Sequence, residues 1–209
     1  MKVLGISCSL RKGGNTEILV GEALAGTREV GAEAELLTLA GKEIKPCDGC
    51  YSCEKTGKCH INDDMQPIYE KLLEADGIII GTPVYFWFMA GQTKVLLDRT
   101  IALRYPSLRL ANKVGGGIAV AARTGLMNAI SVLYTYFASS HMISADYVAG
   151  LADARGAVRK DKFAMKGARE MGKQVVSLIR KGFEFPQEYD RPLYQYIKGK
   201  YGLSSPPFG

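Results

Sequence analysis

The sequence has only two histidines among 209 residues, which leaves little material for histidine-based catalysis. No Ser–His–Asp or Cys–His catalytic set is apparent, so we do not expect a hydrolase of these types. No run of eighteen apolar residues occurs, and we expect no membrane span. The first residues, MKVLGISCSLRKGGNT, lack an apolar signal core followed by a cleavage site, which favours a cytoplasmic location.

Four of the five cysteines lie within thirteen residues, in the pattern Cys47-x2-Cys50-x2-Cys53-x5-Cys59. In a cytoplasmic chain, such a group indicates metal binding or redox chemistry rather than disulfides. Iron–sulfur clusters take four thiolates from runs with short gaps, whereas zinc sites typically use two C-x2-C pairs separated by a longer segment. We therefore predict that these four cysteines bind one iron–sulfur cluster, with zinc as the alternative.

Two further residues bear on the predicted metal centre. Cys8 stands apart from the other cysteines, and we expect it to be a small buried residue. His60 directly follows Cys59 and either tunes the metal centre or is a plain surface residue.

The positive charge of the chain is unevenly distributed. Residues 1–150 hold fifteen Lys and Arg against fifteen Asp and Glu, whereas residues 151–209 hold twelve against six and so account for the net charge of +6. This region either attracts an acidic partner or forms a solvated helix face. No nucleic-acid motif accompanies the charge, and we expect no nucleic-acid partner.

Short apolar runs alternate with helical patterns, which predicts βαβ units and a parallel sheet. We expect a flavodoxin-like α/β fold, a doubly wound sheet of five parallel strands in the order 2-1-3-4-5, with the cysteines inserted after the second strand. Ligands of such sheets bind beyond the carboxyl ends of the strands, where the strand order reverses. The strands are expected at 2–7, 34–39, 77–81, 113–121 and 142–149, and the helices at 16–30, 63–75, 92–103, around 127–137 and at 162–180. Asp63 and Asp64 are expected to cap the second of these helices.

The first loop, SCSLRKGGNT at 7–16, lacks both G-x-G-x-x-G and the Walker A pattern. This argues against nicotinamide-type Rossmann binding and P-loop chemistry. The loop instead places hydroxyls, glycines, an amide and a guanidinium at a helix N-terminus, where free backbone N–H groups favour an anion. A helix cap in a polar loop is the alternative. The residues predicted to hold a terminal phosphate are Ser7, Ser9, Arg11, Asn15 and Thr16.

Two other loops suit a flat ring. TPVYFWFM at 82–89 places four aromatics in a row at the end of a strand, and a cofactor ring would give them a stacking partner. An oligomer interface is the alternative, and both can hold. AARTG at 121–125 permits close backbone approach, with its arginine either near a flavin ring or in solvent. The residues predicted to line the ring are Pro83, Val84, Tyr85, Phe86, Trp87, Ala121, Ala122 and Arg123.

The SxSxRxGGNT loop and the TPVYFWFMAGQTKVLLDR segment resemble the NADPH-dependent FMN reductase superfamily. With the compact cysteine motif after the second strand, residues 1–180 are most similar to the iron–sulfur flavoproteins of anaerobic archaea and bacteria. The resemblance implies one FMN and one 4Fe–4S cluster per subunit, a homodimer or homotetramer, and a ferredoxin-like electron donor. It also implies that assembly brings a cluster near the flavin of a neighbouring subunit. The chain departs from the family's usual G-S-P at Cys8-Ser9-Leu10.

We therefore predict an electron-transfer oxidoreductase that joins the two-electron chemistry of FMN to the one-electron chemistry of a cluster. The alternatives are an NAD(P)H-dependent oxidoreductase that reduces quinones or other small-molecule acceptors, and a zinc-stabilised binding module without redox activity. Residues 1–182 are expected to form the FMN-binding domain, with 46–60 as the cluster loop. Residues 183–209 are expected to be an extension that packs over the body or a neighbour.

Overall fold

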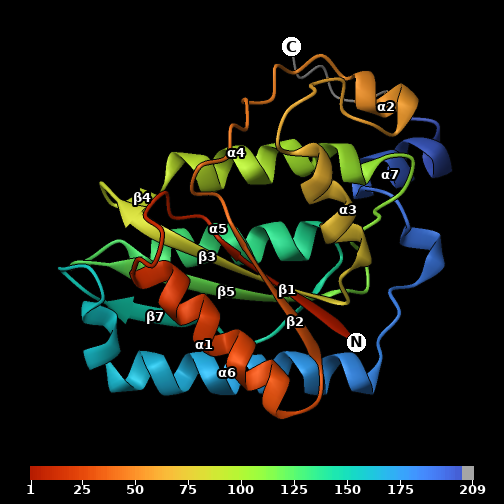
Figure 1. Ribbon diagram of the computed structural model, residues 1–209. Helices are drawn as coiled ribbons and strands as arrows, with labels where there is room; N and C mark the ends of the chain where they lie inside the picture. The colour runs from red at the N-terminus through yellow and green to blue at the C-terminus, as the bar shows by residue number, and fades with distance from the viewer. Residues whose placement is uncertain (204–209) are drawn as a thin grey trace.

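A parallel sheet forms the centre of the fold (Figure 1). The computed structural model describes residues 1–203, so 204–209 of the predicted extension lie outside the described residues, as does the side chain of Tyr194. The strands run in the order β2-β1-β3-β5, and two short strands, β6 and β7, pair in parallel with the other edge of β5. The strands are β1 (Lys2–Ser7), β2 (Glu33–Thr38), β3 (Gly77–Tyr85), β4 (Phe88–Met89), β5 (Val114–Ala121), β6 (Ile143–Ser144) and β7 (Val148–Leu151).

Helices cover both faces of the sheet. One face carries α1 and α6, and the other carries α3, α4 and α5, so the predicted flavodoxin-like α/β class is confirmed. The larger helices are α1 (Asn15–Glu29), α3 (Gln66–Glu74), α4 (Gly91–Arg99), α5 (Leu126–Ser139) and α6 (Lys162–Lys181). The shorter ones are α2 (Ser52–Thr56), α7 (Leu193–Tyr201), η1 (Thr100–Arg104), η2 (Ala157–Lys160) and η3 (Gln187–Tyr189). No described helix is long and apolar enough to cross a membrane.

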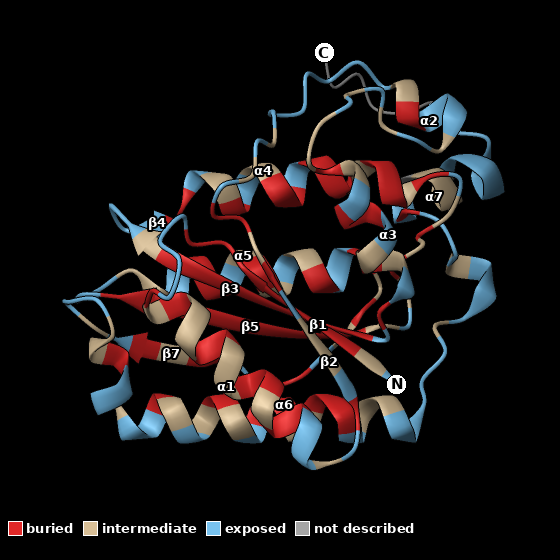
Figure 2. Cartoon of the chain, viewed as in Figure 1, coloured by how far each residue is buried: buried red, intermediate tan, exposed pale blue. Residues whose placement is uncertain are grey.

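The central strands are apolar because both of their faces are covered. Leu4 and Ile6 of β1 and Ile79 of β3 are fully buried, and Figure 2 shows the sheet as the buried centre of the molecule. Close packing of α1 on α6 depends on Gly172, where an added Cβ would lie 1.9 Å from the carbonyl oxygen of Ala23. The helices therefore approach almost to backbone contact on this face.

Three details differ from the expected element boundaries. The third strand was expected to end at 81 but continues to Tyr85, because Thr82 and Pro83 keep the register with β5 and the next two residues pair with β4. The expected fifth strand is divided into β6 and β7. Asp63 was expected to cap α3, yet the helix begins after Met65, and the carboxylate of Asp63 accepts from Met65 N–H at 3.0 Å and pairs with Arg99.

The described part of the C-terminal extension packs against the body of the same chain. The ring of Phe185 stacks on His141 with centroids 3.9 Å apart, and its backbone N–H donates to Asn112 Oδ1 at 2.7 Å. Leu108 N–H donates to the carbonyl of Asp190 at 3.0 Å. These contacts hold the segment along the side of the molecule that α7 occupies in Figure 1.

Candidate functional site

A cavity of about 200 Å³ lies at the carboxyl ends of β1, β3 and β5, where the strand order reverses. It gathers parts of the three predicted loops, which are far apart in sequence. Parallel strands bring their carboxyl ends to one edge, and this explains the meeting of the loops. This cavity is called here the flavin cavity because the sequence predicts a flavin at this place. The predicted residues that line it are Ser9, Arg11, Asn15, Thr16, Pro83, Val84, Tyr85, Ala121 and Ala122.

One end of the flavin cavity is suited to an anion. Gly14 is the N-cap of α1, its backbone is extended, and no side chain caps the first turn of the helix. The free N–H groups of this turn therefore remain available to a phosphate. The loop is closed by Arg11 N–H donating to Ser9 Oγ at 3.1 Å and by Gly14 N–H donating to the carbonyl of Arg11 at 3.0 Å. Ser7 Oγ is buried and has no hydrogen-bond partner in the described part of the chain.

The side chain of Asn15 was predicted to hold a phosphate, but it is bonded to another segment of the chain. Its Nδ2 donates to the carbonyl of Ala154 at 2.7 Å, and its Oδ1 accepts from Val158 N–H at 3.3 Å. The side chain thus joins the start of α1 to the segment after β7, while its backbone N–H stays at the helix N-terminus. Arg155, which the sequence analysis missed, lines the flavin cavity and donates to the carbonyl of Lys12. No motif marks Arg155; only its position just after β7 could have found it.

Four of the predicted residues lie outside the lining of the flavin cavity: Ser7, Phe86, Trp87 and Arg123. Phe86 and Trp87 form the tip of the β3–β4 hairpin and are 96% and 60% exposed. Their φ angles of 44° and 73° lie in the left-handed region, which is costly for bulky residues. The tip rests on α5, since Asn128 Nδ2 donates to the Trp87 carbonyl at 3.2 Å. A role for these residues in lining the ring stays a prediction.

A second cavity, of about 360 Å³, is lined by all four cysteines of the compact motif. Residues at the end of α4 and in η1, namely Asp98, Arg99 and Ile101, complete its wall. Burial raises the pKa of the Cys53 thiol, and the negative charges of Cys59, Cys47 and Cys50 raise it further. A positively charged centre bound by these thiolates in the cavity would remove this repulsion. This space is called here the cysteine cavity.

Among the described residues, the four thiols do not form a closed tetrahedral zinc site. A tetrahedral zinc with bonds of about 2.3 Å would hold its sulfurs about 3.8 Å apart. Among the residues described, no three of the four cysteine sulfurs lie within 4.8 Å of one another. The group that does meet this distance is Asp48, Cys50 and His60. A four-iron cluster separates its ligands more widely, and the donor set of four thiolates suits it.

His60 and Asp48 border the cysteine cavity as a pair. His60 Nε2 lies 2.8 Å from Asp48 Oδ2, and Asp48 Oδ1 accepts from Cys50 N–H at 3.2 Å. Hydrogen bonds from the side chain and backbone of Cys50, and then from His60, lower the pKa of Asp48. Both side chains are about half exposed. The pair therefore shapes the loop between Cys47 and Cys59 from its solvent side.

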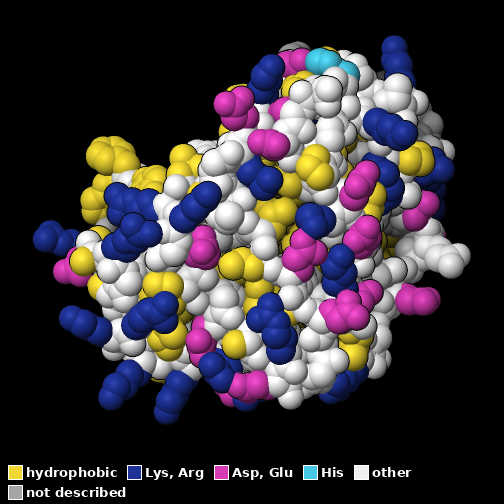
Figure 3. Space-filling view, viewed as in Figure 1, with side chains coloured by type: hydrophobic (Ala, Val, Ile, Leu, Met, Phe, Trp, Pro, Cys, Tyr) yellow, Lys and Arg dark blue, Asp and Glu magenta, His cyan; other side chains and the backbone are white. Residues whose placement is uncertain are grey.

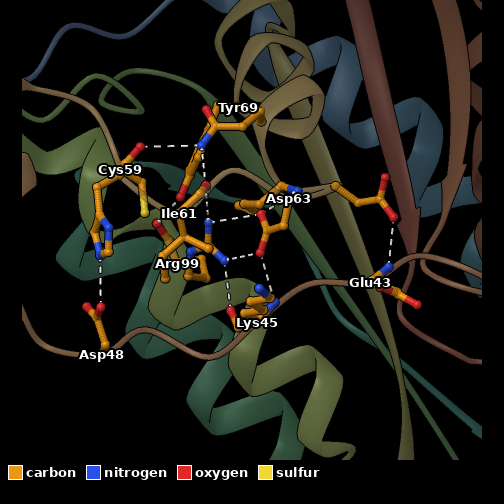
Figure 4. A network of polar contacts seen from close by, with 12 residues as sticks. Glu43, Lys45, Asp48, Cys59, Ile61, Asp63, Tyr69 and Arg99 are labelled. Carbon is orange, nitrogen blue, oxygen red and sulfur yellow. Dashed lines mark hydrogen bonds and ion pairs between the residues drawn. The ribbon is translucent and has the colours of Figure 1, made fainter.

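One buried arginine holds the base of the cysteine loop (Figure 4). The Arg99 side chain is fully buried, and its Nη1 and Nη2 donate to the two carboxylate oxygens of Asp63 at 2.6 and 3.1 Å. The same nitrogens donate to the carbonyls of Lys45 at 2.7 Å and Ile61 at 3.4 Å. Burial raises the pKa of Asp63, but hydrogen bonds from Arg99, Lys45 N–H and Met65 N–H lower it on balance. The guanidinium thus joins both flanks of the loop to α4.

Further hydrogen bonds close the same base of the cysteine loop. Glu43 N–H donates to Asp64 Oδ2 at 2.7 Å, and Asp64 N–H donates to the carbonyl of Glu43 at 3.2 Å. Gln66 Nε2 donates to the carbonyls of Ile61 at 2.6 Å and Cys59 at 3.3 Å. Arg99 is the last residue of the TPVYFWFMAGQTKVLLDR segment, and nothing in that segment indicates its contacts with the loop.

Comparison with known proteins gives three findings. Residues 1–154 match the family described as NADPH-dependent FMN reductase. An iron–sulfur flavoprotein of Methanocaldococcus jannaschii is 42% identical over 190 residues, covering 86% of this chain and 98% of that protein. One of Archaeoglobus fulgidus is 32% identical over 193 residues, covering 85% and 95%. The solved structure of a flavodoxin, a WrbA-like protein from Agrobacterium tumefaciens, shares the fold with a TM-score of 0.62 at 17% identity, covering 87% and 99%.

Proposed function

The chain belongs to the NADPH-dependent FMN reductase family and, within it, to the iron–sulfur flavoproteins, and from this premise we propose that it passes electrons between a 4Fe–4S cluster and FMN. The family makes the chain a flavin oxidoreductase. The observation that supports the more specific role is the meeting of four thiols in one cavity of a chain that also has a flavin cavity. When bound, FMN supplies two-electron chemistry and the cluster supplies one-electron chemistry.

The flavin cavity offers separate groups for the two ends of FMN. Arg11 and the hydroxyls of Ser9 and Thr16, with the free N–H groups of α1, would hold the phosphate. The chain from Pro83 to Tyr85 and the small residues Ala121 and Ala122 would border the ring and exclude water from it. Cys47, Cys50, Cys53 and Cys59 would hold the cluster.

The two cavities lie toward opposite ends of α4. The flavin cavity includes Val84 and Tyr85, which precede this helix, and the cysteine cavity includes Asp98 and Arg99 at its end. Nine helical residues span about 14 Å, and we propose that a second copy of the chain places its cluster nearer to this flavin. The exposed hairpin tip at Phe86 supports such a homodimer or homotetramer, because large exposed aromatics mark interfaces.

Figure 3 shows hydrophobic side chains gathered at the β4 end of the molecule, with lysine and arginine side chains beside them. An apolar patch with a charged border is typical of protein–protein contact. This patch suits the second copy of the chain proposed above. As the electron donor to the cluster, we propose a one-electron carrier of the ferredoxin type, with a small-molecule acceptor as the other possibility for the flavin.

One observation favours a second function, the direct reduction of FMN by NAD(P)H. A cavity of about 550 Å³ adjoins the flavin cavity, shares Ala122, Ala152 and Asp153 with it, and includes Lys160. A second substrate would have room there, with Lys160 beside Asp153 and Asp161 in the lining. In that case the cluster would serve a minor role.

The test is a cofactor assay on protein purified without oxygen. Its absorbance spectrum is recorded, and iron, sulfide, zinc and flavin are measured on the same sample. The proposal predicts one FMN with about four iron and four sulfide per chain. Flavin with zinc or without metal would leave the reductase function, which steady-state NAD(P)H oxidation would then support.

A further inference from the structure

Arg99 has one N–H group for which the described residues supply no partner. A guanidinium carries five N–H groups. The four on Nη1 and Nη2 match four acceptors: two oxygens of Asp63 and the carbonyls of Lys45 and Ile61. Nε is buried and has no hydrogen-bond partner in the part of the chain that the structure describes. Leaving a buried donor unpaired costs about 1–3 kcal/mol, so the position calls for an acceptor.

The cysteine cavity is the place where such an acceptor would lie. Arg99 lines this cavity together with all four cysteines. Burial lowers the pKa of Arg99, but a hydrogen bond with Asp63 and the charges of Tyr69 and Cys59 raise it on balance. Figure 4 shows Cys59, Tyr69 and Arg99 together at this side of the loop. The Tyr69 hydroxyl donates to the Arg99 carbonyl at 2.8 Å, which fixes the arginine backbone.

We propose that the Nε–H of Arg99 donates a hydrogen bond to a sulfur atom of the 4Fe–4S cluster and thereby raises the reduction potential of the cluster. The inference rests on the proposed function. Reduction adds negative charge to the cluster, and a fixed cation with a hydrogen-bond donor stabilises the reduced form more than the oxidised form. Asp63 neutralises part of the positive charge of Arg99 and keeps the two flanks of the loop joined. It leaves the Nε–H of Arg99 unpaired, so this N–H stays available as a donor.

Arg109 provides a matched control within the same region. Its Nη2 donates to the carbonyls of Gly57 and Ala102, both at 2.8 Å, so it too ties the cysteine segment to η1. Its Nε is likewise buried and unpaired among the described residues. Arg109 does not, however, line the cysteine cavity. Substitution of either arginine should loosen the loop in general, whereas only substitution of Arg99 should change the reduction potential of the cluster.

The first test compares Arg99→Lys with Arg109→Lys by anaerobic redox titration of the cluster. Arg99→Lys keeps the positive charge and removes the Nε–H. We expect its equilibrium constant for cluster reduction to fall about tenfold, which is a shift of about 59 mV for a one-electron couple. Arg109→Lys should keep the potential of the wild type. An unchanged potential in Arg99→Lys, or equal shifts in both variants, would overturn the inference.

A second variant, Asp63→Asn, distinguishes the proposed hydrogen bond from Arg99 Nε–H from the role of Arg99 in joining the two flanks of the cysteine loop. Asp63→Asn weakens the ion pair but keeps the Nε–H of Arg99. If holding the flanks were the whole role of Arg99, Asp63→Asn would shift the potential downward as much as Arg99→Lys does. We expect instead that Asp63→Asn does not lower the potential.

A measurement on the wild type covers the case in which Arg99→Lys takes up no cluster. Protein labelled with ¹⁵N-arginine is reduced to the paramagnetic state of the cluster, and pulsed electron paramagnetic resonance records nitrogen couplings. We expect one ¹⁵N coupling that Arg109→Lys retains. Its absence from protein with a full complement of iron and sulfide would contradict the inference alone, whereas absence of iron and sulfide would contradict the proposed function.

Discussion

The flavin cavity and the cysteine cavity are built in different ways. The first lies where parallel strands end, and its walls come from the loops that any sheet of this order brings together. The second is a loop outside the sheet, whose base is closed by Arg99 and Asp63 rather than by strand pairing. The topology of the sheet positions the one, and a few buried side-chain contacts position the other.

This difference indicates where each site is vulnerable. Many hydrogen bonds of the sheet support the strand ends, so single side chains at the flavin cavity should affect binding more than folding. The cysteine loop depends on a few contacts, and its buried ion pair, Arg99 with Asp63, would leave a buried charge without compensation if it were broken. The predictions below compare the two regions in order of expected effect.

The largest effect is expected from Asp63→Ala. Breaking a buried ion pair costs about 3–5 kcal/mol, because the remaining charge of Arg99 is left unpaired. We expect urea unfolding of cluster-free protein to show a lowered stability, and iron content to fall while FMN binding persists. The exposed pair of Glu170 with Lys173 is the control, and Glu170→Ala should leave the unfolding midpoint unchanged. Equal stability of the two variants would contradict the assigned role of the buried pair.

The next effect concerns the hairpin beside the flavin cavity. Gly125 has a φ of 85°, and an added Cβ would lie 2.7 Å from the Trp87 carbonyl oxygen. Gly125→Ala should therefore cost about 1–3 kcal/mol in thermal unfolding. Gly21, within α1, has no atom within 4 Å of an added Cβ, so Gly21→Ala should stabilise the protein by about 0.4–1 kcal/mol. Equal changes in thermal stability for Gly125→Ala and Gly21→Ala would mean that the hairpin does not rest on the start of α5.

An effect of similar size, on FMN binding rather than on folding, is expected at the phosphate end of the flavin cavity. Arg11→Ala should weaken FMN affinity about tenfold or more, because a charge-assisted hydrogen bond contributes about 1.5–3 kcal/mol. Lys12 does not line the cavity, so Lys12→Ala should change the affinity less. Titration of flavin-free protein with FMN measures both constants. An Arg11 variant with the affinity of the wild type would remove Arg11 from the phosphate site.

The smallest expected effect concerns the reactivity of the buried thiol of Cys8 compared with that of the exposed thiols. Burial raises the pKa of Cys8 to about 12, against a weaker effect of a hydrogen bond with Thr93. At pH 8 this thiol is protonated and inaccessible, whereas Cys47 and Cys50 are exposed. Iodoacetamide should therefore modify the exposed pair in cluster-free protein and reach Cys8 only after unfolding, as peptide mass spectrometry would record. Early modification of Cys8 would show that the start of the phosphate loop opens.

The sequence was a good guide to the sheet and to the loops at its edge. Apolar runs such as 2–7 and 113–121 coincide closely with β1 and β5, because strands that are covered on both faces must be apolar throughout. The hairpin was missed because Phe86 and Trp87 are unusual residues for a tight turn, where glycine and asparagine are normal. Its aromatics were therefore expected along a loop rather than at an exposed tip.

The contacts around the cysteines were beyond the reach of sequence reasoning. The spacing from Cys47 to Cys59 predicted that the thiols would share a site, and they line one cavity. Asp63 was expected to cap a helix, because an aspartate before an apolar run is typical of helix starts. Its pairing with Arg99 joins positions 36 residues apart, and local patterns contain no information about contacts of that separation.

The central claim is that electrons pass between the cluster and FMN, and stopped-flow reduction tests it most directly. Wild-type protein and Cys50→Ala, each loaded with FMN, are mixed without oxygen with reduced ferredoxin, and flavin absorbance is followed. Direct photoreduction of FMN serves as the control. The account predicts rapid flavin reduction in the wild type, a rate near background in Cys50→Ala, and equal photoreduction in both. Equal rates with ferredoxin would contradict the account, since electrons would then reach FMN without the cluster.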